Sequence, residues 1–371
     1  MVRVALIAAA AALIAGCGGE KEIAPSSREG ETPQTLSEWG MVTARKGAFH
    51  LGKGVTPYDL ATPLFSDYAL KLRTVWTPGG APATYNPDTV FDFPVGTVIT
   101  KTFYYPQSGD GWTGDVSIGK ERTINNGALA LDHLRLVETR VLVRRAEGWE
   151  ALPYVWNDEQ TDATLKRTGA VIPMTLHRND GRMEPFSYLV PNANQCAACH
   201  ATNATTKAIQ PIGPKARHLN KPSSFEPGFN QLDYWLAVGL LKGDIAQPAP
   251  RNAAWTDESE PLEARARAYL DANCSHCHNP NGAADTSGLN LEPDASGPAY
   301  GFCKAPIAAG RGTGGRAYDI VPGRPDHSIT VFRLESTDPG AMMPELGRAV
   351  SHEEGVKLVT EWIAAMDGAC G

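Results

Sequence analysis

The sequence predicts an α+β multidomain protein: an N-terminal antiparallel β domain, then a small helical segment, then an all-α C-terminal domain. Three observations predict this order. Short β-branched and aromatic runs, bounded by Gly, Pro, Asn and Asp, fill residues 37–190. Two Cys-x-x-Cys-His motifs follow, at 196–200 and 274–278. Apolar residues at helical spacing lead into the second motif and recur near the end of the chain.

The strand candidates are apolar runs that stop at turn-forming residues. Pro78 and Gly79 follow one such run, and a Pro-Val-Gly turn at 94–96 precedes the longest one. The candidates are residues 75–77, 91–93, 98–105, 134–143 and 152–156. Because strands and turns alternate with no helical stretch between them, we expect antiparallel pairing within this domain.

Helices are expected around both Cys-x-x-Cys-His motifs. Residues 228–241 form a short, mostly apolar stretch after the first motif. Leu262, Ala266 and Tyr269 share a helical face that leads directly into the second motif. Apolar residues between 356 and 366 share the face of a closing helix, which Ser351 would begin with a capping box.

Composition and these patterns divide the chain into six segments. A flexible tether is expected where a Pro/Ser/Glu/Thr mixture shows no apolar periodicity, and a linker where Pro248 and Pro250 interrupt the chain. The expected segments are a signal peptide at 1–17, the tether at 18–36, the β-rich domain at 37–190, the segment of the first motif at 191–242, the linker at 243–257 and the final domain at 258–371.

The N-terminus has the pattern of a bacterial lipoprotein signal. A positive start precedes an apolar run at 4–15, and small residues precede Cys17. We expect Cys17 to carry lipid and to anchor the exported chain to the periplasmic face of a bacterial membrane. Gly18, rather than Asp, follows Cys17, which favours the outer membrane. A plain signal peptide is the alternative.

Each Cys-x-x-Cys-His motif is typical of covalent haem c attachment. Cysteines at i and i+3 reach both vinyl groups of one haem, and the next residue, His, lies over the iron. A single Cys₄ zinc site is the alternative, but it leaves both histidines without a role. We therefore expect two haem c groups, bound by Cys196, Cys199 and His200 and by Cys274, Cys277 and His278.

These motifs make the middle segment a helical haem segment and the final domain cytochrome c-like, because a class I cytochrome c packs the helix before its motif against its last helix. In such a domain, Met followed by Pro supplies the second iron ligand from a loop before the last helix. Met343 precedes Pro344 and is expected to be that ligand, with Met342 or a core methionine as alternatives. His276, between the second motif's cysteines, is expected at the surface and not on iron.

The second axial ligand of the first haem is open at this stage. His218 and Met183 are the leading candidates, His177 and Met174 are weaker ones, and an open coordination position is a further alternative. Cys303 and Cys370 remain after the other cysteines are assigned. In an oxidising compartment they are expected to form a disulfide, with two free buried thiols as the alternative.

Four stretches carry a resemblance to a known family. They are residues 58–71 (YDLATPLFSDYALK), 93–97 (FPVGT), 154–157 (YVWN) and 269–274 (YLDANC). In this order they resemble exported bacterial dihaem c-type cytochromes, conserved proteins without an assigned reaction, over nearly the whole chain after Cys17. The resemblance implies haem binding and electron transfer, but no donor, acceptor or substrate.

Electron transfer is the expected function, with a redox partner protein and no assigned catalytic residue. The formal net charge of −7 argues against nucleic acid as a partner. One alternative is a dihaem peroxidase or oxidase with an open first haem. The other is a binding module, in which the β domain recognises a partner and the haems serve a neighbouring redox protein. The small-molecule substrate, if there is one, is not indicated.

Overall fold

A six-stranded antiparallel sheet forms the centre of the β-rich part, in the computed structural model of residues 24–371 without 108–110, 121–123, 125–126 and 246. Its strand order is β11-β10-β9-β6-β4-β3. The strands are β3 (Thr56–Tyr58), β4 (Leu70–Trp76), β6 (Val98–Pro106), β9 (Leu134–Arg145), β10 (Gly148–Trp156) and β11 (Ala163–Leu165). The predicted signal peptide and lipidated Cys17 lie outside the described residues.

Three smaller sheets complete the described strands, in the orders β1-β2-β8, β13-β12-β7 and β14-β5. All their pairs are antiparallel except β12–β7 and β14–β5, which are parallel. The strands are β1 (Val42–Arg45), β2 (Ala48–Leu51), β5 (Ala83–Thr84), β7 (Asp115–Ser117), β8 (Ala128–Ala130), β12 (Ala170–His177), β13 (Met183–Val190) and β14 (Leu241–Lys242).

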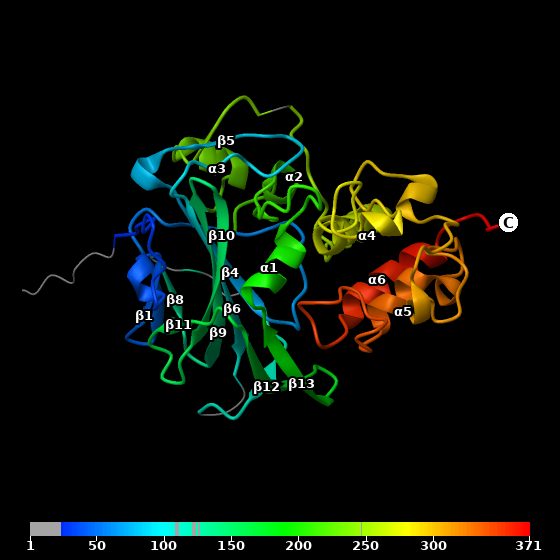
Figure 1. Cartoon of the computed structure of the whole chain (residues 1–371), viewed down its shortest axis with the longest axis horizontal. Coiled ribbons are helices and arrows are strands. Elements are labelled where there is room, and N and C mark those ends of the chain that lie inside the picture. The colour runs from blue at the N-terminus through cyan, green and yellow to red at the C-terminus, as the bar shows by residue number, and fades with distance from the viewer. Residues whose placement is uncertain (1–23, 108–110, 121–123, 125–126, 246) are drawn as a thin grey trace, which may run out of the picture.

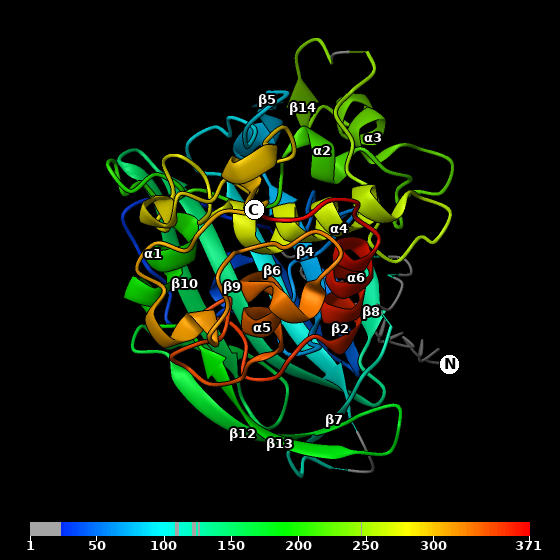
Figure 2. The ribbon, with the colours of Figure 1, turned by 90° about the vertical axis from the view of Figure 1, so that its right-hand side faces the viewer.

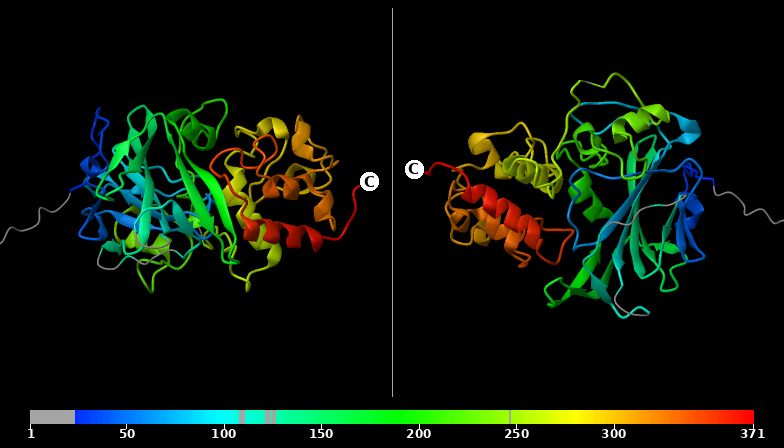
Figure 3. Two further views of the ribbon diagram at one scale, coloured as in Figure 1. Left: turned by 90° about the horizontal axis from the view of Figure 1, so that it is seen from below. Right: turned by 180° about the vertical axis from the view of Figure 1, so that it is seen from behind.

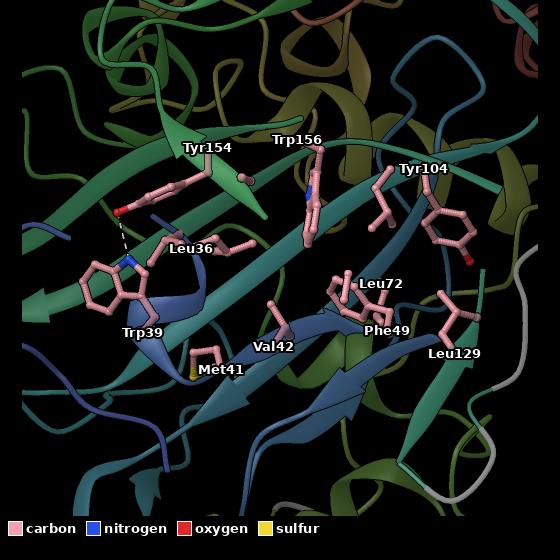
Figure 4. Close-up of a cluster of buried hydrophobic side chains, with 14 of the residues drawn as sticks. Leu36, Trp39, Met41, Val42, Phe49, Leu72, Tyr104, Leu129, Tyr154 and Trp156 are labelled. Atoms are coloured by element: carbon pink, nitrogen blue, oxygen red, sulfur yellow. Dashed lines mark hydrogen bonds between the residues drawn. The ribbon is translucent and has the colours of Figure 1, made fainter. Parts of the chain in front are cut away.

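One face of the central sheet packs on the β1-β2-β8 sheet through a cluster of buried hydrophobic side chains (Figure 4). Trp39 and Tyr154 are both fully buried there, and Trp39 Nε1 donates a hydrogen bond to Tyr154 Oη at 2.8 Å. Tyr154 Oη in turn donates to the carbonyl of Pro33, and Leu36 is fully buried. The end of the predicted tether, residues 33–36, therefore contacts the β-rich part.

The described helices are short. They are α1 (Ala193–His200), α2 (Ala216–Leu219), α3 (Gln231–Ala237), α4 (Leu262–Leu270), α5 (Ile329–Glu335) and α6 (Glu353–Ala364). Figure 1 shows α1 on the side of the sheet that faces the C-terminal segment, residues 258–371. Figure 3 shows that segment beside the sheet as a separate body, and in Figure 2 it lies in front of the sheet.

The predicted fold class is wrong in its C-terminal part: residues 258–371 are not an all-α domain. Over the described residues the chain is mostly β, with 27% strand against 21% helix. The expected helices are present as α4 and α6, which contact each other, and α5 packs on α6. Between α4 and α5 the chain runs through short turns and loops, with bridges that pair Phe302 with Ile320 and Tyr318 with Ser328.

Composition explains why the chain between α4 and α5 forms turns and loops and no α-helix. Nine glycines lie between residues 282 and 323, and each costs a helix about 1 kcal/mol relative to alanine.

The start of α6 also differs from the predicted capping box, because His352 is the N-cap and its side chain makes no capping hydrogen bond.

Candidate functional site

The first Cys-x-x-Cys-His motif occupies the second half of α1, which contacts β10. Asn192 and Gln195 begin this helix with a capping box: the backbone N–H of each donates to the other's side-chain oxygen at 2.9 Å. Cys196 is buried and His200 is the last helical residue. The cap fixes the rotation of a single short helix, so it also fixes the direction of both motif thiols.

The second motif follows α4 through a π-helical turn, Asp271–Ser275. Its backbone continues as a tight turn, in which the N–H groups of Cys277 and His278 both donate to the carbonyl of Cys274. Asp271 is fully buried within this turn and accepts hydrogen bonds from Arg217 Nε at 2.8 Å and Nη2 at 2.9 Å. Since Arg217 lies on α2, this ion pair attaches the first-motif segment to the second motif.

The two motifs are in contact. The Sγ of Cys277 lies 3.6 Å from the carbonyl oxygen of Ala198, which is between the cysteines of the first motif. Cys199 lies close enough to Cys277 and His276 for each of them to lower the pKa of its thiol. None of the four motif cysteines is in a disulfide. The attachment points that the sequence predicts separately are thus neighbours in space.

His276 is not the surface residue that the sequence analysis expects. Only 5% of its surface is exposed, and its Nδ1 has no hydrogen-bond partner among the described residues. Cys199 of the first motif lies near it, since His276 lowers the pKa of the Cys199 thiol. A single sequence does not show this proximity, since the two motifs are far apart along the chain.

Both motif histidines have the tautomer that leaves Nε2 available to a metal. His200 Nδ1 lies 2.7 Å from the carbonyl oxygen of Gln210, which can only accept, so Nδ1 carries the proton. His278 Nδ1 lies 3.1 Å from Ser287 Oγ, whose own proton goes to the carbonyl of Ala284. Burial lowers the pKa of each imidazole to about 4, which keeps both rings neutral. A neutral ring held through its other nitrogen is the usual form of a ligating histidine.

A cavity opens beside the first motif. It encloses about 830 Å³ of space, part of which is open solvent. Cys196, His200 and His218 all line it, and the strands of the central sheet form another wall. A thiol and an imidazole of the first motif therefore line one cavity with a second imidazole, His218.

The four candidates for the second axial ligand of the first haem differ in whether they line this cavity. His218 is 3% exposed and shares the cavity with His200, whereas Met183 is 61% exposed at the start of β13. Met174 is buried in a hydrophobic cluster that does not line the cavity. His177 Nε2 lies within hydrogen-bonding distance of an Asp115 carboxylate oxygen. The ring of His218 faces Asn252 Nδ2 at 3.4 Å and Asp271 Oδ2 at 3.6 Å. Ligation of iron would require Nε2 to turn from Asp271.

The second site is less complete. Met343 lines a smaller cavity of about 270 Å³ with Tyr269, Asn273 and His352. His278 does not line it. Arg348 holds the Met343 loop by donating to the carbonyls of Met343 and Arg333. The attachment residues and the imidazole tautomer fit a haem, but the described structure does not bring Met343 and His278 into one cavity.

Other predicted features can be placed directly. Cys303 and Cys370 form a disulfide with a Cα–Cα distance of 5.2 Å, the expected pairing. Among the described residues, no cluster of three or more His, Cys, Asp or Glu side chains is arranged to hold a bare metal ion. The described helices include none with the length and hydropathy needed to cross a membrane.

Comparisons with known proteins return nothing: no protein-family model, no curated protein and no solved structure matches this chain.

Proposed function

We propose that the chain is an exported dihaem c-type cytochrome that passes electrons to a redox partner protein. One observation carries the proposal: the two Cys-x-x-Cys-His motifs contact each other at Cys277 Sγ and Ala198, and the first of them borders a cavity that Cys196, His200 and His218 line together. A haem pair attached here would supply reversible one-electron chemistry on iron. Two Cys-x-x-Cys-His motifs that carry no haem would not require a cavity beside them.

The protein's own residues support this function in three ways. Gln210 and Ser287 orient the two proximal imidazoles through Nδ1. The buried Arg217–Asp271 pair holds the two motifs together. His218 is the proposed second axial ligand of the first iron, because it is the candidate that shares the cavity with His200. A closed coordination sphere favours electron transfer over substrate binding.

A peroxidase- or oxidase-type enzyme is the second candidate, and one observation favours it. The ring of His218 faces Asn252 and Asp271, and if it stays there the first iron keeps an open position. Absorption and paramagnetic resonance spectra of the holoprotein, with and without carbon monoxide, decide between the two. Two low-spin, unreactive haems support the carrier, and one high-spin, carbon monoxide-binding haem supports the enzyme.

Haem attachment itself is tested by the mass of the purified chain and by the absorption of its reduced pyridine adduct. We expect two haem c per chain, and one in each of two variants: Cys196→Ser with Cys199→Ser, and Cys274→Ser with Cys277→Ser. A Cys303→Ser and Cys370→Ser variant is the matched control and should retain two. A wild-type chain without covalent haem, from cells that attach haem to a known cytochrome c, would refute the proposal.

We also propose export and lipid anchoring at Cys17, which rest on the first 17 residues alone. Cys17→Ser should release the protein from the membrane fraction into the soluble periplasmic fraction. A variant that remains with the membrane would contradict the anchor.

A further inference from the structure

Three cationic residues stand directly opposite one another across the central sheet. Arg73 on β4 pairs in register with Lys101 on β6, and Lys101 pairs with Arg140 on β9. We call Arg73, Lys101 and Arg140 the cation row. Like charges at directly opposed positions destabilise a sheet, so a row of three requires a compensating interaction.

The cation row faces the cavity beside the first motif. All three side chains line it, together with Cys196 and His200. Arg73 is only 4% exposed. Burial, with Arg140 and Arg73 as neighbours, holds the pKa of Lys101 well below its usual value, which shows the cost of this arrangement.

The described residues neutralise only one member of the row. Glu138 accepts two hydrogen bonds from Arg140, at 2.6 and 3.0 Å, and a third from Tyr188 Oη at 2.7 Å. Arg73 Nη1 is buried without a hydrogen-bond partner in the described structure. Lys101 Nζ makes no hydrogen bond or ion pair within the described structure and lies 5.0 Å from the centre of the Phe103 ring. Two basic side chains therefore line the cavity without a counter-charge among the described residues.

We propose that Arg73 and Lys101 bind carboxylates of the group that occupies this cavity, and that these are the two propionates of the haem attached at Cys196 and Cys199. This inference rests on the proposed function. Its chemistry is a charge-assisted contact between a buried cation and a carboxylate, which is the strong form of hydrogen bond. A free small anion that enters the cavity is the other source of the same chemistry.

The test is a redox titration of the holoprotein and its Lys101→Met variant. Without Lys101, propionate charge is less compensated and favours ferric iron, so the potential of the first haem should fall. We expect at least a tenfold shift in the electron equilibrium between the two haems, about 59 mV for one electron. Arg73→Met should act in the same direction, and Lys101→Arg should restore the potential. The exposed Lys166→Met is the matched control. If neither Lys101→Met nor Arg73→Met differs from this control, the inference is overturned.

The titration is repeated with sodium phosphate and with succinate at constant ionic strength, which separates the two sources. If propionates occupy the row, neither anion changes the wild-type potential. A saturable shift in the wild type that Lys101→Met abolishes would show a free-anion site and overturn the propionate assignment.

Failure of the proposed function has a different signature. If the purified chain carries no covalent haem, calorimetric titration with the same two anions still tests the row. Binding that Lys101→Met abolishes would support an anion site in the cavity, and no binding to the wild type would overturn it.

Discussion

The Sγ of Cys277 lies 3.6 Å from the carbonyl oxygen of Ala198, so the second motif rests on the first. This contact joins α1, which packs on the β-rich part, to the turn after α4 in the C-terminal segment. The candidate site therefore consists of residues from both the β-rich part and the C-terminal segment. Four predictions depend on contacts of this kind.

The first prediction concerns coupling between the two attachment sites. Because the motifs touch, the ferric paramagnetic resonance spectrum of the holoprotein should differ from the sum of the two single-haem variants. Those variants are Cys196→Ser with Cys199→Ser, and Cys274→Ser with Cys277→Ser. A spectrum equal to the simple sum would show that the haems do not interact across the contact.

The second prediction separates the axial-ligand candidates. His218→Ala should convert the first haem from low-spin to high-spin and allow carbon monoxide to bind, because His218 lines the cavity with His200. Met183→Ala should leave the spectrum unchanged, since Met183 is 61% exposed on β13. A low-spin first haem in the His218 variant would assign the ligand elsewhere.

The third prediction concerns the ion pair between the motif segments. Arg217→Met leaves the carboxylate of Asp271, fully buried, without its cation, and should lower the free energy of unfolding by about 3–5 kcal/mol. Urea unfolding measures the loss. Arg251→Met is the matched control, because Arg251 pairs with Glu260 while its side chain is 51% exposed, and it should cost below about 1 kcal/mol. Equal costs would show that burial of the pair is not what matters.

Local patterns predict the local parts of this structure well. The strand candidates at 98–105 and 134–143 fall within β6 and β9, and the spacing of Leu262 to Tyr269 matches α4. The prediction of an all-α C-terminal domain is wrong, because helical spacing at both ends of the domain does not determine the structure of the glycine-rich chain between them. Helix and strand patterns report on neighbours in sequence, and fold class depends on the long connections.

The candidate site shows the same division. The attachment residues and proximal histidines follow from a motif, whereas the burial of His276 and the cavity shared by His200 and His218 follow from packing between distant segments. The cation row has one local indication: Arg73, Lys101 and Arg140 each lie within an otherwise strand-like run. Nothing in a single sequence shows that these three stand side by side.

The fourth prediction concerns Asp67, which joins the β-rich part to the residues before α6. Asp67 Oδ1 accepts hydrogen bonds from the backbone N–H groups of Ala349 at 2.6 Å and Val350 at 2.9 Å. Burial raises its pKa from 3.8 to about 6, although these backbone hydrogen bonds and nearby cations oppose the shift. The folded protein thus favours the protonated carboxyl.

A raised folded-state pKa fixes the sign of the pH dependence. The stabilisation is complete below the unfolded pKa, near 4, and is lost as the pH rises through about 6. A shift of two pKa units corresponds to about 3 kcal/mol. We expect Asp67→Asn to remove this part of the pH dependence of urea unfolding between pH 4 and 7. Asn still accepts both backbone hydrogen bonds and tolerates the φ of +48° at this position. Exposed Asp132→Asn is the control and should keep the wild-type slope, and an identical slope in both variants would refute the assignment to Asp67.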